Sequence, residues 1–294
     1  MERRMLVRDG VTLSSLIGGE GPPVVLLHGL AGSAAEFAPT ARALLPDHRV
    51  VVLDQRGHGH STRRPGDLSR EAFVADTVRV IEHLGGPVTL VGQSMGGHTA
   101  LLTAAWHPGL VERLILVEAG VGGTDDPEAA RKLEEFFAGW PVPFASRAAA
   151  AEHLGGTPIA HAWAADLDDG GRPRFDADVM AAAIAPVLAE ARWDEWASIT
   201  ADILLVRGES GIIPQAEVDR MLRLRPAARH VLVPDAGHDL HLDRPAAWHE
   251  ILRRSLARRE GSATDRQPGP SRSATRRSDL GQCEASETAG RLPT

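Results

Sequence analysis

A serine flanked by glycines follows a short apolar run in the first third of the chain. Residues 92–97 read Gly-Gln-Ser-Met-Gly-Gly, directly after Val88-Thr89-Leu90-Val91. A strand that bends sharply into a helix here places the Ser94 hydroxyl at the end of the strand and at the N-terminus of the helix. Gly92 and Gly96 lack the Cβ atoms that would clash with the following helix. The pattern therefore predicts a nucleophile whose attack on a carbonyl creates an oxyanion.

A serine nucleophile needs a base, and His238 is the best candidate. It lies in Asp235-Ala236-Gly237-His238-Asp239, a loop after the last apolar run of the chain. Gly237 permits a tight turn that brings the imidazole toward the carboxyl edge of a sheet, where catalytic groups gather in open α/β folds. His241 fits less well, because we expect it at or near the start of the last helix.

The oxyanion that forms on attack needs hydrogen-bond donors, and backbone N–H groups can supply them. One predicted donor is the N–H of Met95, which follows the serine. The other is the N–H of Leu30, in the loop His28-Gly29-Leu30-Ala31-Gly32 after the apolar run at 24–27. Both are main-chain groups, so the side chains at these two positions do not decide the prediction.

These residues must be positioned by a sheet, and short β-branched runs predict its strands. The predicted strands cover residues 3–7, 11–17, 24–27, 50–53, 88–91, 114–117, 203–206 and 230–233. Runs that are apolar on both faces are typical of a buried parallel sheet. Helical patterns at 34–45, 69–84, 95–106, 214–224 and 245–258 alternate with them. The alternation predicts an α/β fold with a mostly parallel sheet and helices on both faces.

One interval of about 80 residues, between the runs that end near Val117 and begin near Ile203, has no strand signal. It predicts helices and holds most of the aromatic residues, so we interpret residues 119–198 as a helical cap inserted in a core formed by residues 1–118 and 199–260. The aromatics can form the cap's own core, but some should line an apolar pocket. Trp140, Trp163 and Phe137 are the candidates for that pocket.

Composition limits the classes of function. The 294 residues are 43% hydrophobic and carry a net charge of −7, which argues against a nucleic-acid-binding surface. No apolar run reaches the roughly 20 residues that span a bilayer, and the N-terminus lacks the apolar stretch of a signal peptide. We expect a cytoplasmic protein without a membrane partner. Residues 261–294, which include the only cysteine, Cys283, have few large apolar side chains and are expected to be disordered.

The motifs occur in the order and spacing of a known family. The segments His28-Gly29, Asp54-Gln55-Arg56-Gly57-His58-Gly59-His60-Ser61, Gly92–Gly97 and Ala236-Gly237-His238 together resemble the α/β-hydrolase superfamily with a helical cap inserted after strand 6. The resemblance covers about residues 3–258 and implies the α/β-hydrolase fold. His58 and His60 belong to a turn motif that is usually structural in the family, so we expect no metal and no cofactor.

The acid that orients the histidine is where this chain departs from the family pattern. The family most often keeps an Asp just after the strand that here ends at Val206-Arg207-Gly208, and Gly211 stands at that place. Some relatives place their acid at the end of the preceding strand, where this chain has Glu118. Glu118 preserves the order serine, acid, histidine. Glu209, another acid, or no acid at all remain alternatives.

The sequence thus predicts a serine hydrolase that cleaves a carboxylic ester, lactone or related acyl bond of a small, largely apolar substrate. Carbon–carbon bond hydrolysis and acyl transfer use the same kind of site and stay open, because the cap and pocket choose the substrate. A third reading is a ligand-binding or tailoring protein that uses the pocket without acyl-enzyme chemistry, and Gly211 at the usual acid position motivates it.

Overall fold

The computed structural model describes residues 1–257, of which Met1–Leu256 form one compact unit. The end of the predicted core at residues 258–260 and the expected disordered segment at 261–294 lie outside the described residues. No helix among residues 1–257 is both long and apolar enough to cross a membrane.

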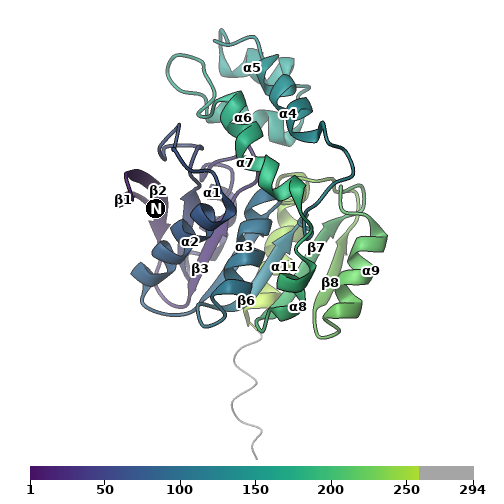
Figure 1. The fold of residues 1–294 in the computed structure, drawn as a ribbon. Coiled ribbons are helices and arrows are strands. Elements are labelled where there is room, and N and C mark those ends of the chain that lie inside the picture. Colours follow the sequence, from purple (N-terminus) through teal and green to yellow (C-terminus); the bar gives the residue numbers. More distant parts are fainter. Residues whose placement is uncertain (258–294) are drawn as a thin grey trace, which may run out of the picture. The chain divides into compact units, whose positions relative to one another are not determined.

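A single eight-stranded sheet organises the described chain (Figure 1). Its strands are β1 (Glu2–Arg8), β2 (Val11–Gly18), β3 (Pro23–Leu27), β4 (Arg49–Asp54), β5 (Val88–Gln93), β6 (Val111–Val117), β7 (Asp202–Gly208) and β8 (Arg229–Val233). The order across the sheet is β1-β2-β4-β3-β5-β6-β7-β8. β1 and β2 pair antiparallel, as do β2 and β4, and every other neighbouring pair is parallel. The predicted mostly parallel sheet is confirmed.

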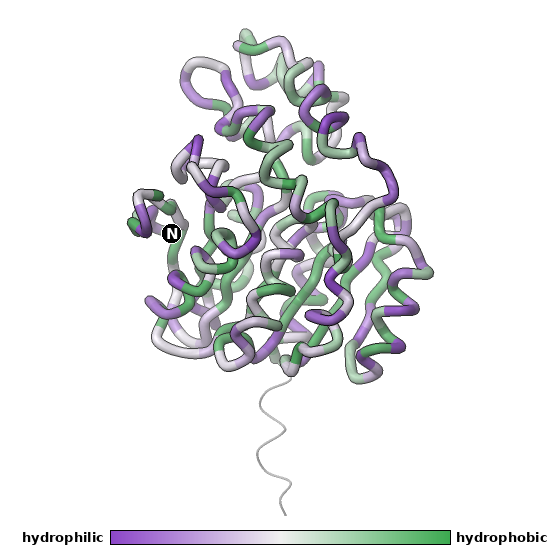
Figure 2. The backbone as a smooth tube through the Cα atoms, in the orientation of Figure 1, coloured by the Kyte–Doolittle hydropathy of each residue, from purple (hydrophilic) through white to green (hydrophobic). Residues whose placement is uncertain are grey.

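Helices cover both faces of this sheet and lie between its strands in sequence (Figure 1). They are α1 (Ala38–Leu44), α2 (Arg70–Leu84), α3 (Met95–Trp106), α4 (Ala129–Ala138), α5 (Arg147–His153), α6 (Pro158–Ala165), α7 (Ala177–Ala189), α8 (Trp193–Ser198), α9 (Gln215–Leu224), α10 (Leu240–Asp243) and α11 (Pro245–Ala257). Figure 2 shows apolar residues along the strands and mixed polarity along the surrounding helices.

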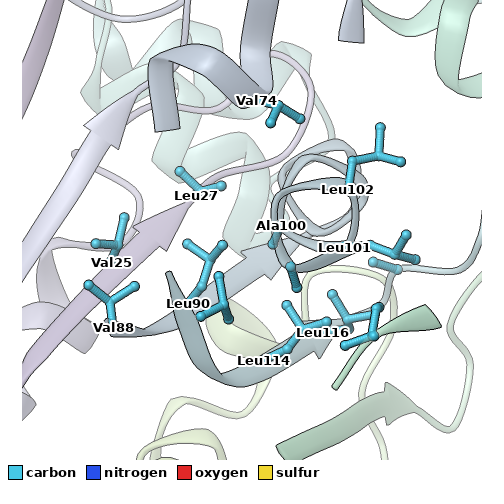
Figure 3. Close-up of a cluster of buried hydrophobic side chains, with 14 of the residues drawn as sticks. Val25, Leu27, Val74, Val88, Leu90, Ala100, Leu101, Leu102, Leu114 and Leu116 are labelled. Atoms are coloured by element: carbon cyan, nitrogen blue, oxygen red, sulfur yellow. The ribbon is translucent and has the colours of Figure 1, made fainter. Parts of the chain in front are cut away.

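The central strands are apolar on both faces because each face packs against helices. In β3, Val25 and Leu27 belong to one buried cluster, which includes side chains of α2 and α3 (Figure 3). Val24 and Leu26 belong to the cluster on the other face, with Trp248 of α11. Successive residues of a strand point to opposite faces, so a two-sided core requires an uninterrupted apolar run.

Local signals explain where the helices begin and end. The Ser69 side chain accepts a hydrogen bond from the Ala72 N–H at the start of α2, and Gly85 ends that helix in the left-handed conformation (φ 80°). The helix predicted over residues 34–45 is shorter: it spans Ala38–Leu44, and Pro39, which has no N–H to donate to a preceding turn, lies in its first turn. The short helices α8 and α10 were not predicted.

Five helices, α4 to α8, lie between β6 and β7 in sequence. α4, α5 and α6 project beyond the sheet, and α7 leads back toward it (Figure 1). Four aromatic residues of this segment, Phe137, Trp140, Phe144 and Phe175, belong to one buried cluster, whereas Trp196 of α8 belongs to a cluster of the sheet. α7 also packs on α2 and α3, because its Ile184 and Val187 share a buried cluster with Phe73 of α2 and Met95 of α3.

Candidate active site

The turn from β5 into α3 holds Ser94 in a backbone conformation that is rare for a residue with a side chain. Its φ is 51° and its ψ is −119°, and its N–H donates to the Val117 carbonyl at the end of β6 (3.0 Å). Such strain persists only where surrounding structure enforces it, and it is common at functional sites. Ser94 is half-buried, whereas the residues on either side of it are buried. The turn therefore presents one accessible hydroxyl.

Close backbone approach explains both glycines of this turn. A Cβ on Gly92 would overlap the carbonyl of Gly96 in α3, as predicted. A Cβ on Gly96 would overlap the carbonyls of Leu27 and His28 at the end of β3. The turn is thus pressed against the neighbouring strand as well as against its own helix.

Ser94 borders a cavity of about 640 Å³. The volume is in the range of small-molecule sites, roughly 300–1,000 Å³. The predicted residues that line it are Leu30, Ser94, Met95, Glu118, Phe137, Trp163 and His238. The structure therefore gathers residues from the ends of β3, β5, β6 and β8 and from α4 and α6 around one space.

His238 lies in the loop after β8, and its imidazole stands between an acid and an amide. Nδ1 is 3.7 Å from Glu118 Oε2, which is within ion-pair range but longer than a hydrogen bond. Nε2 is 3.3 Å from the side-chain nitrogen of Gln93, the residue before the serine. Among residues 1–257, His238 Nδ1 has no hydrogen-bond partner. The loop is fixed by the N–H of Gly237, which donates to Asp243 (2.8 Å).

Glu118 directly follows β6, and its side chain is fully buried. Oε1 accepts a hydrogen bond from the Gly208 N–H (2.6 Å), and Oε2 accepts one from the Ile212 N–H (2.8 Å). Its φ of 44° is in the left-handed region, as at Ser94. Two backbone donors and a strained backbone fix this carboxylate at the end of its strand.

The carboxyl group of Glu118 occupies the space that a side chain at position 211 would need. A Cβ at position 211 would overlap the carboxyl group of Glu118. The loop after β7 therefore admits this carboxylate only because residue 211 has no side chain. Glu209, the alternative acid, is exposed and accepts a hydrogen bond from the Asp235 N–H (3.0 Å), and it does not line the cavity. The structure brings Glu118, and not Glu209, to His238.

The two residues whose N–H groups are the predicted oxyanion donors line the same cavity as Ser94. Met95 is the first residue of α3, so its N–H has no acceptor in the preceding turn of the helix. The loop of Leu30 turns through a hydrogen bond from the Gly32 N–H to the Gly29 carbonyl (3.2 Å). A Cβ on Gly29 would be 3.3 Å from the Ser94 Cβ, which shows how closely this loop approaches the serine.

Aromatic side chains form one wall of the cavity. Phe137 and Trp163 line it, together with Phe136, which the sequence reasoning missed. Leu133, Phe136 and Phe137 stand at i, i+3 and i+4 on α4, a spacing that puts them on one helix face. Trp140 does not line the cavity. Trp140 packs against the wall residues instead: its ring centroid is 5.6 Å from that of Phe137 and 5.2 Å from that of Trp163.

Polar side chains that the sequence reasoning did not assign to the site also line the cavity. They are Glu36, Gln93, His98, Thr124, Glu217 and Asp239. Burial raises the pKa of Asp239, and burial also raises the pKa of Glu217. Burial lowers the pKa of His98 to about 3, with nearby Arg70 and Arg192 lowering it further, so this imidazole is neutral. His98 lies one helical turn after Ser94, which was the available signal for it.

His241 joins the two loops beside the site. It lies in the short helix α10, before the last helix, and its Nε2 is 2.6 Å from Glu36 Oε1. Its ring stacks on Phe37 with a centroid distance of 4.4 Å. Glu36 follows the Leu30 loop and His241 follows His238, so this buried pair holds the two loops together.

Comparisons with known proteins agree with this geometry. A sequence model described as "Alpha/beta hydrolase family" matches residues 24–251. The sn-1-specific diacylglycerol lipase ABHD11 of Mus musculus is 31% identical over 262 residues, which cover 83% of this chain and 84% of that protein. The 2-(acetamidomethylene)succinate hydrolase of Mesorhizobium japonicum is 28% identical over 246 residues, or 78% of this chain and 85% of that protein.

A solved structure extends the comparison to the fold. The crystal structure of E-2-(acetamidomethylene)succinate hydrolase has a TM-score of 0.78 and 26% sequence identity to this chain. The superposition covers 87% of this chain and 99% of that one. The similarity therefore includes the helices between β6 and β7 as well as the sheet.

Proposed function

The chain belongs to the alpha/beta hydrolase family, and from this premise we propose that it is a serine hydrolase acting through an acyl-enzyme. The bond it cleaves is a carboxylic ester, a lactone or a related acyl bond. The substrate is a small molecule that is largely apolar. Neither a metal nor a cofactor takes part in the proposed reaction.

The fit of the Glu118 carboxylate into the space above Gly211 is the observation that carries this proposal. Loss of the usual acid position would favour a binding protein without catalysis. Here the vacated position is filled by another carboxylate, which is fully buried, held by two backbone N–H groups and 3.7 Å from the imidazole. A buried, desolvated carboxylate next to a histidine supports a catalytic role better than a chance contact does.

In the first half of the proposed reaction, Ser94 Oγ attacks the substrate carbonyl while His238 Nε2 takes the hydroxyl proton. Nε2 faces Gln93 in the structure, so a rotation of the ring toward Ser94 precedes this transfer. Glu118 then stabilises the imidazolium through Nδ1. The N–H groups of Leu30 and Met95 hold the oxyanion, and the loss of one such donor typically costs about 100- to 1,000-fold in rate.

In the second half, His238 gives the proton to the leaving alcohol, and a water molecule replaces the alcohol. The imidazole takes a proton from this water, whose oxygen attacks the acyl carbonyl of the ester at Ser94. Collapse of the second tetrahedral intermediate releases the carboxylic acid and returns the proton to Ser94 Oγ. The serine and histidine are thus restored, and water is the only co-reactant.

The cavity wall supports an apolar substrate. Leu133, Phe136, Phe137 and Trp163 form one side, and Ile184 and Val187 of α7 form another. The mouse relative, named as a diacylglycerol lipase, acts on an ester of a neutral lipid, in keeping with this wall. We assign an acylglycerol-like or simple alkyl ester to this chain on these grounds.

A panel of esters, lactones and thioesters tests the proposal with wild type and Ser94→Ala. We expect wild type to turn over at least one ester or lactone and Ser94→Ala to lose at least about 10,000-fold in kcat. Full turnover by Ser94→Ala would rule out the acyl-enzyme. A fluorophosphonate probe tests the binding-protein alternative, because labelling of Ser94 that is lost in His238→Ala requires an activated serine.

A further inference from the structure

The charged side chains that line the cavity are of one sign. Four carboxylates face it, from Glu36, Glu118, Glu217 and Asp239. Among the residues of the described chain, 1–257, neither a lysine nor an arginine lines this cavity. The guanidinium groups of Arg70 and Arg192 lower the pKa of His98, but neither side chain lines the cavity. The lining therefore offers no cation to a bound anion.

Three of the four carboxylates have a histidine nearby. Glu36 pairs with His241 at 2.6 Å, Glu118 lies 3.7 Å from His238, and Asp239 interacts with both of these histidines. Glu217 differs, because within residues 1–257 it has no lysine, arginine or histidine in ion-pair range. Its charge is the one that the protein leaves uncompensated at the cavity.

Glu217 is built into its place. It lies in the first turn of α9, and its Oε1 accepts a hydrogen bond from the Val121 N–H (2.9 Å). A Cβ on Gly120 would overlap its carboxyl group, so the segment that leaves β6 makes room for this side chain. Its second oxygen has acceptor capacity left, on a half-buried residue that borders the substrate space.

We propose that the cavity selects esters whose remaining polar groups are uncharged, and that Glu217 is the residue that sets this choice. A substrate carboxylate would lose its hydration beside an uncompensated carboxylate, with no cation in the lining to offset the cost. A neutral group with an N–H or O–H would instead donate to Glu217. The inference rests on the proposed function, because it takes the cavity beside Ser94 as the substrate site.

The charge of this cavity distinguishes the chain from one of its relatives. The 2-(acetamidomethylene)succinate hydrolase of Mesorhizobium japonicum is named for a substrate with carboxylate groups. The cavity described here, with Glu217 and without a lining guanidinium group, opposes such a substrate. A shared fold is therefore compatible with a different choice of substrate charge.

Two esters of equal length and shape test this selection. Monoethyl adipate ends in a carboxylate, and ethyl adipamate ends in a carboxamide that is neutral and carries N–H donors. We expect wild type to have a kcat/KM on the order of 100-fold higher for the adipamate, as repulsion between two poorly solvated charges implies. Equal rates on the two esters would overturn the proposal.

Two variants locate the determinant. Glu217→Gln keeps the shape and removes the charge, so we expect it to reduce the preference for the adipamate about tenfold. Asp219→Asn removes an equal charge from the same helix, where Asp219 is exposed and outside the cavity, and should keep the wild-type preference. An unchanged preference in Glu217→Gln would show that Glu217 is not the determinant.

Binding to Ser94→Ala separates this inference from the proposed reaction. Calorimetric titration of the same two esters measures charge selection without turnover, and we expect the adipamate to bind at least tenfold more tightly. This preference without hydrolysis of either ester by wild type would contradict the proposed reaction and still support the inference. Equal binding of the two esters by Ser94→Ala would overturn the inference even if wild type hydrolyses both.

Discussion

The two sides of the cavity are built in different ways. On the sheet side, Ser94 and Glu118 stand at the ends of adjacent strands with φ of 51° and 44°, and backbone contacts of the neighbouring glycines fix the chain there. On the helical side, Phe137 and Trp163 are held by ring packing on α4 and α6. Backbone geometry thus positions the residues on the sheet side, and packing of side chains positions those on the helical side.

This difference between the two sides separates the catalytic chemistry from the choice of substrate. Strand ends hold groups in fixed relative positions, which the transfer of a proton and the binding of an oxyanion require. Packed aromatic side chains can be exchanged for others of similar volume at modest cost, so they adjust the substrate without moving the serine. Substitutions on the sheet side should therefore act on kcat, and substitutions on the helical side should act on KM and stability.

The largest expected effect is on the sheet side, at the proposed base. His238→Ala removes the proton acceptor, and we expect kcat to fall by at least about 10,000-fold while the thermal unfolding temperature stays near that of wild type. Steady-state kinetics with the best ester of the panel and a thermal melt measure the two quantities. A loss confined to KM would contradict the contrast drawn between the two sides.

The next largest effect is expected at Glu118, the proposed acid. Glu118→Gln keeps the shape of the side chain but removes its charge, and we expect kcat to fall by about 1,000- to 10,000-fold. Glu209→Gln, on a side chain outside the cavity, should remain within about twofold of wild type. A loss of kcat in Glu209→Gln alone would show that the acid had been assigned to the wrong strand end.

On the helical side, Phe137 and Trp140 offer a direct contrast. Both are buried in one aromatic cluster, but only Phe137 lines the cavity. Phe137→Ala and Trp140→Ala should each lower the free energy of unfolding by about 3–5 kcal/mol. Phe137→Ala should in addition raise KM about tenfold. Equal KM values in the two variants would mean that the wall does not bind substrate.

A smaller effect, on the pH dependence of stability, is expected from His98, the buried imidazole one helical turn after Ser94. The pKa of His98 is lowered to about 3 by burial, so the unfolded chain binds its proton below about pH 6.5 and the folded chain does not. Stability therefore rises with pH between about 3 and 6.5, and His98 contributes a loss of about 1 kcal/mol between pH 7.5 and 5.5. Urea unfolding of His98→Gln should show a correspondingly smaller loss. An identical loss in wild type and variant would contradict a neutral His98.

Sequence patterns predicted the sheet side better than the helical side. Ser94, Leu30 and His238 follow strands that are recognisable from their apolar runs. Because parallel strands end at the same edge of the sheet, the topology predicts that these three residues lie close together. Glu118 was predicted from the family resemblance, because Gly211 stands at the usual acid position and some relatives place their acid at the end of the preceding strand. The contact of Gln93 with His238, the place of Glu217 and the place of Trp140 outside the cavity lining depend on packing between distant segments. No local pattern encodes these three.

The most direct test of the account exchanges the acid between the two strand ends. Glu118→Gly removes the carboxylate and frees the space that a side chain at position 211 needs, and Gly211→Asp then supplies a carboxylate there. We predict that Glu118→Gly and Gly211→Asp each lower kcat by at least about 100-fold, and that the double variant recovers at least about tenfold over Glu118→Gly. A Glu118→Gly protein that folds and keeps the wild-type kcat would contradict the account.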